Sequence, residues 1–219
     1  MRQLFAPGAD AILRLAILAT VGVLLAAVIA LTGYAHSAYV GNVGIAPEQP
    51  VPFSHKHHVA ELGLDCRNCH QYAATQATAG LPPTTTCMTC HSRIWDQSPM
   101  LAPVRDSLAQ GVPLHWVRVN RLPDYVYFNH AIHVSKGVGC ASCHGAVDTM
   151  QLTYAARSFT MAFCLDCHRA PAAALRPLPA VWDMHWQPPA DQAARGRTLI
   201  AARHIEGPAR LTQCSTCHR

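Results

Sequence analysis

The chain has 219 residues, enough for one or two domains, and a formal net charge of +5. Apolar residues make up 50% of it, whereas aromatic residues reach only 7% and charged residues only 13%. These proportions are unusual for an ordinary globular protein. No segment resembles a nucleic-acid-binding module, so we expect no nucleic-acid partner.

The first feature along the chain is an uncharged apolar segment from Leu15 to Gly33. Its length is close to the ~20 residues that cross a bilayer as a helix. A cleaved signal peptide, cut near Ala35, is the alternative, but signal-peptide cores are shorter, at ~7–15 residues. Arg2 and Arg14 precede the segment, and basic residues favour the cytoplasmic side. We expect residues 1–34 to be a retained single-pass anchor in the inner (cytoplasmic) membrane, with the N-terminus in the cytoplasm.

All ten cysteines lie in five C-x-x-C-H motifs, the attachment pattern of c-type haem. Two thiols three positions apart can each add to one vinyl group of the same porphyrin, and the next histidine then ligates the iron. The predicted attachment residues are Cys66, Cys69, Cys87, Cys90, Cys140, Cys143, Cys164, Cys167, Cys214 and Cys217. The predicted proximal ligands are His70, His91, His144, His168 and His218.

Disulfides and zinc sites are the alternatives to haem. A disulfide framework gives no reason for a histidine after every second cysteine, and tetrahedral zinc sites combine two such cysteine pairs or one pair with distant histidines. We therefore predict five covalently attached c-type haems. Because such haems are attached outside the cytoplasm, we expect the haem-bearing part on the periplasmic or equivalent outer face. Haem propionates also change the surface charge, so the net charge of the sequence identifies no partner.

The haem motifs form an internal repeat. The pattern F-x-H-x-x-H-V, followed by a short spacer and C-x-x-C-H, begins at Phe53 and again at Phe128, and a further haem motif follows each copy. We predict a first two-haem module in residues 35–110 and a second in residues 111–219, which also contains the C-terminal fifth haem.

The predicted fold class is a multihaem cytochrome c, mostly coil, with short helices packed around haems and one N-terminal transmembrane helix. Frequent proline and glycine residues break longer elements. We expect short helices at the haem motifs, one further helix at residues 190–204, and little strand. A chain with so few residues per haem cannot bury an ordinary core, so the porphyrins should form it.

The repeat also suggests the distal iron ligands. His55 and His58 in one copy match His130 and His133 in the other, and a spacing of three places both imidazoles on one side of a helical turn. They could then reach two neighbouring irons, although surface histidines are the alternative. His57 has no counterpart in the second copy and is not expected to bind iron.

One iron is left without a sixth ligand from the repeat. We favour Met150, because the first module has no methionine at that place. A methionine ligand would raise the potential of its haem above those of the bis-histidine haems. The sequence leaves other candidates open: Met184, His185, His115 and His204.

These patterns resemble the class III multihaem cytochromes. Four further stretches resemble the pentahaem subunit of alternative complex III, a bacterial quinol:electron-acceptor oxidoreductase. They are Leu81–Ser92, Trp116–Val119, Leu122–His130 and Leu211–Arg219. The resemblance covers the whole chain. It implies iron–sulfur and quinol-binding partner subunits, a small electron acceptor protein, a lipid bilayer, and one haem with His/Met ligation.

The resemblance implies a role in electron transfer, in a respiratory or photosynthetic chain, and no catalytic site of the subunit's own. A stand-alone membrane-anchored quinol dehydrogenase cytochrome is the first alternative, with quinol bound near Tyr34 or His36. A multihaem reductase of a small anion is the second. It needs an open iron beside a cluster of catalytic side chains, and the sequence shows no such cluster.

Overall fold

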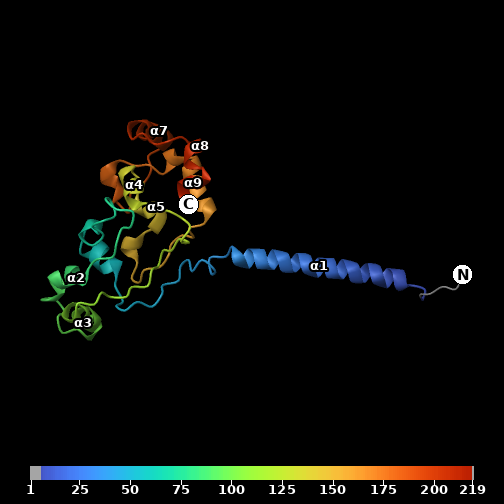
Figure 1. The fold of residues 1–219 in the computed structure, drawn as a ribbon, viewed down its shortest axis with the longest axis horizontal. Helices are drawn as coiled ribbons and strands as arrows, with labels where there is room; N and C mark the ends of the chain where they lie inside the picture. Colours follow the sequence, from blue (N-terminus) through green and yellow to red (C-terminus); the bar gives the residue numbers. More distant parts are fainter. Residues whose placement is uncertain (1–5, 219) are drawn as a thin grey trace. The chain divides into compact units, whose positions relative to one another are not determined.

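The computed structural model describes residues 6–218, which divide into two compact units, one up to Val43 and one from Gly44 onward. Arg2, which contributes to the predicted membrane orientation, and Arg219 lie outside the described residues. The first unit consists mainly of α1 (Ala9–Ala35), drawn in blue in Figure 1. This helix is long and apolar enough to cross a membrane, with a mean hydropathy of 2.7 in its most apolar window. The predicted apolar segment is therefore a continuous helix.

The second unit is made of short helices joined by coil, and within the described residues it contains no β-strand. Two isolated bridges join Val126 to His218 and Val138 to Leu175. The α-helices are α2 (Thr84–His91), α3 (Ala102–Gln110), α4 (His130–Ser135), α5 (Cys140–His144), α6 (Met161–Arg169), α7 (Gln192–Ala202), α8 (Pro208–Leu211) and α9 (Cys214–Cys217). The tighter or wider turns are η1 (Lys56–Glu61, π), η2 (Cys66–Asn68), η3 (Pro99–Leu101), η4 (Val147–Thr149), η5 (Pro171–Ala173) and η6 (Leu178–Val181), the last five of them 3₁₀.

Each C-x-x-C-H motif lies on a short helical turn, as predicted. The first is on η2, and the other four are on α2, α5, α6 and α9. The expected helix at residues 190–204 is also present, as α7. Local side chains start several of these helices: the Thr160 hydroxyl accepts a hydrogen bond from Phe163 N at 3.2 Å and caps α6.

The two H-x-x-H segments fold alike, as one helical turn ended by a glycine. His55 caps η1 and His58 lies within it, whereas His130 and His133 both lie in α4. The glycines that follow, Gly63 and Gly137, have φ angles of +70° and +87°. Such angles favour glycine, so each repeat uses a left-handed residue to turn the chain toward its haem motif.

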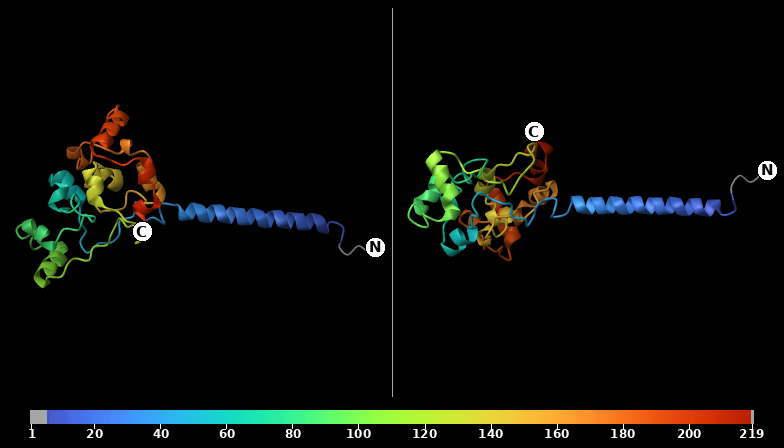
Figure 2. Two further views of the ribbon diagram at one scale, coloured as in Figure 1. Left: turned by 45° about the horizontal axis from the view of Figure 1, so that its top comes forward. Right: turned by 90° about the horizontal axis from the view of Figure 1, so that it is seen from below.

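The second unit has little hydrophobic core of its own. One small cluster of Val51, Leu101 and Val104 joins the start of the unit to α3. Helix α2 packs against α3 and against this cluster (Figures 1 and 2). Many large apolar side chains in this unit are instead half or more exposed, among them Leu81, Trp95, Tyr125, Tyr127 and Met161. A polypeptide that leaves so much apolar surface open needs a large apolar partner to fold around.

Candidate haem sites

The structure brings four of the five proximal histidines opposite the four histidines that the repeat selected. The ring centroids of His55 and His70 are 6.5 Å apart, and those of His58 and His91 are 6.1 Å apart. In the second copy, His130 faces His144 at 6.4 Å, and His133 faces His168 at 6.2 Å.

These distances match the space that one iron needs between two imidazoles. A metal–nitrogen bond to histidine is about 2 Å long, and the ring centroid lies about 1 Å beyond that nitrogen. Two imidazoles on opposite sides of one iron therefore have centroids roughly 6 Å apart. Direct stacking of two rings allows closer centroids, down to ~4.5 Å. The four histidine pairs thus fit bis-histidine haem irons, and no group of three or more metal-binding side chains occurs in residues 6–218 that would suit a zinc ion instead.

The angle between the two ring planes is steep in only one of the four histidine pairs. The His55–His70 and His130–His144 rings are inclined by only 8° and 6°, and the His133–His168 rings by 27°. The His58–His91 rings are inclined by 65°. Steeply inclined imidazoles bring the two iron d orbitals that share the unpaired electron close in energy.

We therefore expect the iron between His58 and His91 to give a highly anisotropic low-spin EPR signal in the oxidised protein. The other three pairs, whose planes are inclined by at most 27°, should give ordinary rhombic signals. Low-temperature EPR of the holoprotein checks this. Finding only rhombic signals would contradict the steep angle of the His58–His91 pair.

A hydrogen-bond partner holds the Nδ1 atom of every histidine in these pairs, and of His218. This is the usual second contact of an iron- or zinc-bound imidazole, and it leaves Nε2 toward the metal. Seven of these nine partners are main-chain carbonyl oxygens, at 2.8–3.3 Å. The exceptions are Thr153 Oγ1, at 2.9 Å from His55 Nδ1, and the Asn120 amide, at 3.1 Å from His144 Nδ1. No sequence signal marked Thr153 or Asn120, because they lie 98 and 24 residues from their histidines.

Burial keeps several of these imidazoles in the neutral form that binds iron. Burial, and next the neighbouring His70, lowers the pKa of His55 to about 4. Burial and the facing His130 lower the pKa of His144 to about 4 as well. Burial also lowers the pKa of His133. A protonated imidazole has no free lone pair for a metal, so these environments favour ligation near neutral pH.

No disulfide joins any two of the ten cysteines, all of which lie within the described residues. Burial, and next the nearby Cys66, raises the pKa of Cys140 to about 11. Burial, and next Cys167 and Cys164, raises the pKa of Cys143 to about 11. Buried protonated thiols of this kind are poor metal ligands.

Contacts between segments connect the third motif to the first and the fourth motif to the fifth. The main-chain N and the Nδ1 atom of His130 both donate to Ala77 O, just after the first motif, at 3.1 Å. His168 Nδ1 donates to Leu211 O at 2.9 Å, and α6 packs against α8, just before the fifth motif. The histidines of η1 face the first and second motifs and those of α4 face the third and fourth. Together with these contacts, this gives the motifs the spatial order second, first, third, fourth, fifth.

The ring of His218, in the fifth motif, faces Tyr125 rather than a histidine. The two ring centroids are 5.8 Å apart, and His218 Nδ1 donates to Tyr125 O at 3.3 Å. Met150, the predicted second ligand of this iron, is buried, and its main-chain oxygen accepts a hydrogen bond from Lys56 N at 3.0 Å. Its main chain thus lies beside η1, whose histidines face the first and second motifs. The role of Met150 as a ligand stays a prediction.

Two of the other four candidate ligands, Met184 and His185, are adjacent in the chain. His185 Nε2, the atom that would bind iron, is 2.8 Å from the buried carboxylate of Asp148. Met184, next to it, is partly buried. His57 points away from the histidine pairs and bonds Glu61 through Nδ1 at 2.8 Å, while its ring stacks on Trp95. That His57 binds no iron stays a prediction.

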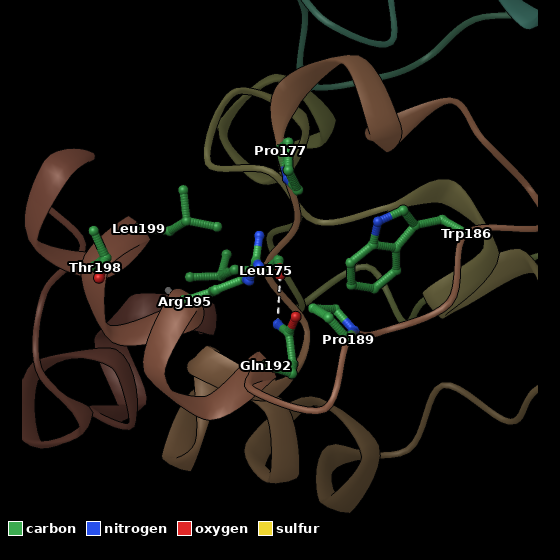
Figure 3. Close-up of a pocket in the computed structure, with 8 residues that line it drawn as sticks. All are labelled: Leu175, Pro177, Trp186, Pro189, Gln192, Arg195, Thr198 and Leu199. Carbon is green, nitrogen blue, oxygen red and sulfur yellow. Dashed lines mark hydrogen bonds between the residues drawn. The ribbon is translucent and has the colours of Figure 1, made fainter.

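A hollow of about 290 Å³ lies between α7 and the segment before it, outside these sites (Figure 3). Leu175, Trp186 and Leu199 supply its apolar walls. Gln192 fixes one side by donating to Leu175 O at 2.7 Å. None of the predicted haem residues lines this hollow.

Comparison with known proteins supports the cytochrome architecture in both halves of the second unit. A family described as "Class III cytochrome C family" matches residues 35–103, and one described as "Cytochrome c7 and related cytochrome c" matches residues 126–219. A curated relative, "Menaquinone reductase, multiheme cytochrome c subunit" of Nitratidesulfovibrio vulgaris, is 39% identical over 98 residues. The match covers 44% of this chain and 46% of the relative, so the chain spans about half the length of that protein.

The geometry and the family matches lead to the same architecture. Histidine pairs are spaced for an iron, C-x-x-C-H motifs lie on helical turns, and many large apolar side chains of the second unit are exposed. The chain is thus built of multihaem cytochrome c domains that bind c-type haem covalently and serve electron transport, of mostly helix and coil, with one N-terminal apolar helix that could span a membrane.

Proposed function

We propose that this chain is the pentahaem electron-transfer subunit of a membrane quinol:electron-acceptor oxidoreductase. The observation that carries the proposal is the four histidine pairs with centroids 6.1–6.5 Å apart. An iron with two axial histidines has no open position for a substrate, so it exchanges electrons only.

The chain's own residues hold and orient the haems. Each pair of motif cysteines would form the two thioether bonds to one haem, and the following histidine would be the proximal ligand. His55, His58, His130 and His133 would be the distal ligands of the first four haems. Met150, the sequence-based candidate for the fifth, has its main chain beside η1, whose histidines face the first and second motifs, so the geometry does not bring it to the fifth motif. The bound haem supplies one-electron redox chemistry. The Nδ1 contacts keep each imidazole in a single orientation.

The motif order supports a relay between two ends. The second and fifth motifs lie at the ends of the spatial order, and the first and third lie beside each other where the modules meet. We assign residues 35–110 and 111–219 to these two modules. Electrons could therefore enter near one terminal motif and leave near the other.

The membrane setting follows from α1 and the predicted haem chemistry. We assign residues 1–34 to a single-pass anchor in the inner membrane, with the N-terminus in the cytoplasm. The haem-bearing unit would lie on the periplasmic or equivalent outer face. Quinol oxidation would belong to other subunits, and this chain would carry no catalytic site.

The type of complex rests on the resemblance and on the relative. The resemblance to the alternative complex III subunit implies iron–sulfur and quinol-binding partners and a small electron acceptor protein. The curated relative is a subunit of a menaquinone reductase, which supports a complex that handles a membrane quinone.

Affinity purification of the tagged full-length holoprotein from its native membranes tests this assignment. We expect iron–sulfur and quinol-binding subunits to be purified with it, and we expect the complex to oxidise menaquinol. The isolated chain, once reduced, should pass electrons to a small oxidised cytochrome c but should not oxidise menaquinol. Menaquinol oxidation by the isolated chain would instead identify a stand-alone quinol dehydrogenase. Nitrite reduction by it would identify a reductase.

A further inference from the structure

Asn120 holds His144 in a way that differs from the other predicted iron ligands. His144 belongs to the third motif, and its ring is parallel to that of His130. Asn120 Nδ2 lies 3.1 Å from His144 Nδ1, and Asn120 Oδ1 is buried without a hydrogen-bond partner among the described residues. A buried amide oxygen without a hydrogen-bond partner is unfavourable.

Haem binding would decide which end of the Asn120 amide, Nδ2 or Oδ1, can form a hydrogen bond with His144 Nδ1. An iron bound by His144 would take the lone pair of Nε2, so the ring proton would be on Nδ1, which would then need an acceptor. The amide NH₂ group is a donor only. Rotation of the Asn120 amide by 180° exchanges its two ends and presents Oδ1, the atom without a partner, to the Nδ1 proton.

We propose that Asn120 Oδ1 accepts the Nδ1–H hydrogen bond of iron-bound His144, and that Asn120 is the positioning residue that sets the potential of the third-motif haem. This proposal depends on iron ligation by His144 but not on the identity of the complex. A stronger acceptor at Nδ1 makes the imidazole a more basic ligand, which stabilises ferric over ferrous iron and lowers the potential.

Hydrogen bonds on both sides of Asn120 hold the coil segment that carries it. The Gln49 side chain binds both main-chain groups of Val117: Gln49 Nε2 donates to Val117 O at 2.9 Å, and Val117 N donates to Gln49 Oε1 at 2.9 Å. At the other end of the segment, Tyr127 N donates to Cys217 O at 2.8 Å. The coil that carries Asn120 is therefore held by these hydrogen bonds, and Asn120 contacts His144 from it.

Only one other predicted ligand has a side-chain partner at Nδ1 in residues 6–218. It is His55, beside Thr153 Oγ1. His55 and His144 belong to the first and third motifs, which lie next to each other. The two sites at the junction of the modules can thus be changed by single substitutions, whereas main-chain carbonyls hold the others.

Two Asn120 substitutions with opposite expected effects test the proposal. Asn120→Asp supplies a charged, stronger acceptor and should lower the potential of the third-motif haem. Asn120→Leu removes the acceptor and should raise it. We expect roughly a tenfold change in the redox equilibrium constant for each, which equals about 59 mV for one electron.

The measurement is an EPR-monitored potentiometric titration of the full-length holoprotein. The third-motif haem is identified as the one whose low-spin signal is lost in His130→Ala. Thr153→Val is the matched control: it should move the potential of the first-motif haem and leave that of the third unchanged. If Asn120→Leu does not retain the haem, the Asp variant alone decides through the sign of its shift.

Opposite shifts at the third-motif haem support the proposal. Unchanged potentials, or shifts of both variants in the same direction, would overturn it, because a purely structural role does not depend on acceptor strength. Either result is independent of whether quinol-binding subunits are purified with the chain, so failure of this proposal is distinguishable from failure of the proposed function.

Discussion

Replacement of all ten motif cysteines by alanine is expected to leave the second unit unfolded. In residues 6–218 the buried apolar side chains are only Val51, Ala73, Leu101, Val104, Met150, Ala155, Leu175 and Val181. Their burial is small beside the conformational entropy lost when such a chain is ordered. The apolar surface that the structure leaves open needs porphyrins against it, as small metal-dependent domains need their metal.

Thermal unfolding followed by circular dichroism checks this expectation. The wild-type holoprotein should unfold in a cooperative transition, whereas the cysteine-free chain, produced without haem attachment, should show none. A double variant, Cys87→Ala with Cys90→Ala, provides a graded control. It removes only the second motif, where Val51, Leu101 and Val104 supply a local core, so most of the unit should still fold. A cooperative transition in the cysteine-free chain would refute a porphyrin core.

The second large effect is expected from His58→Ala, which should turn one low-spin iron into a high-spin iron with an open position. His58 faces His91 at 6.1 Å, so its removal leaves that iron with one axial ligand. In the reduced state the variant should bind about one carbon monoxide per chain at this iron. EPR and carbon monoxide titration measure the two changes.

His57→Ala is the matched control, because His57 lies on the same turn and is next to His58 in sequence. Its ring stacks on Trp95 and its Nδ1 bonds Glu61, so its loss should leave the iron low-spin. A low-spin His58→Ala variant would show that another group ligates this iron. A high-spin His57→Ala variant would show that His57, and not His58, is the ligand.

The sequence alone predicted the class of site and the elements that carry it. The C-x-x-C-H spacing is local chemistry, since two thioethers and one ligand must reach a single porphyrin from a single turn. For that reason the helical turns at the motifs, α7 and the apolar α1 could be predicted from neighbouring residues, whereas haem attachment by the motif cysteines and ligation by the proximal histidines stay predictions. The repeat likewise selected the four histidines that now face the proximal ones.

Only the tertiary structure decided which partners meet. The pairing of His55 with His70 and of His58 with His91, the spatial order of the motifs, and the contacts of His144 with Asn120 and of His55 with Thr153 join residues distant in the chain. No local pattern encodes these contacts, because they depend on how coil segments are held by main-chain hydrogen bonds between the modules. The sequence by itself thus indicated the class of site, because the motif is local, and the fold determined how the candidate residues are arranged and held.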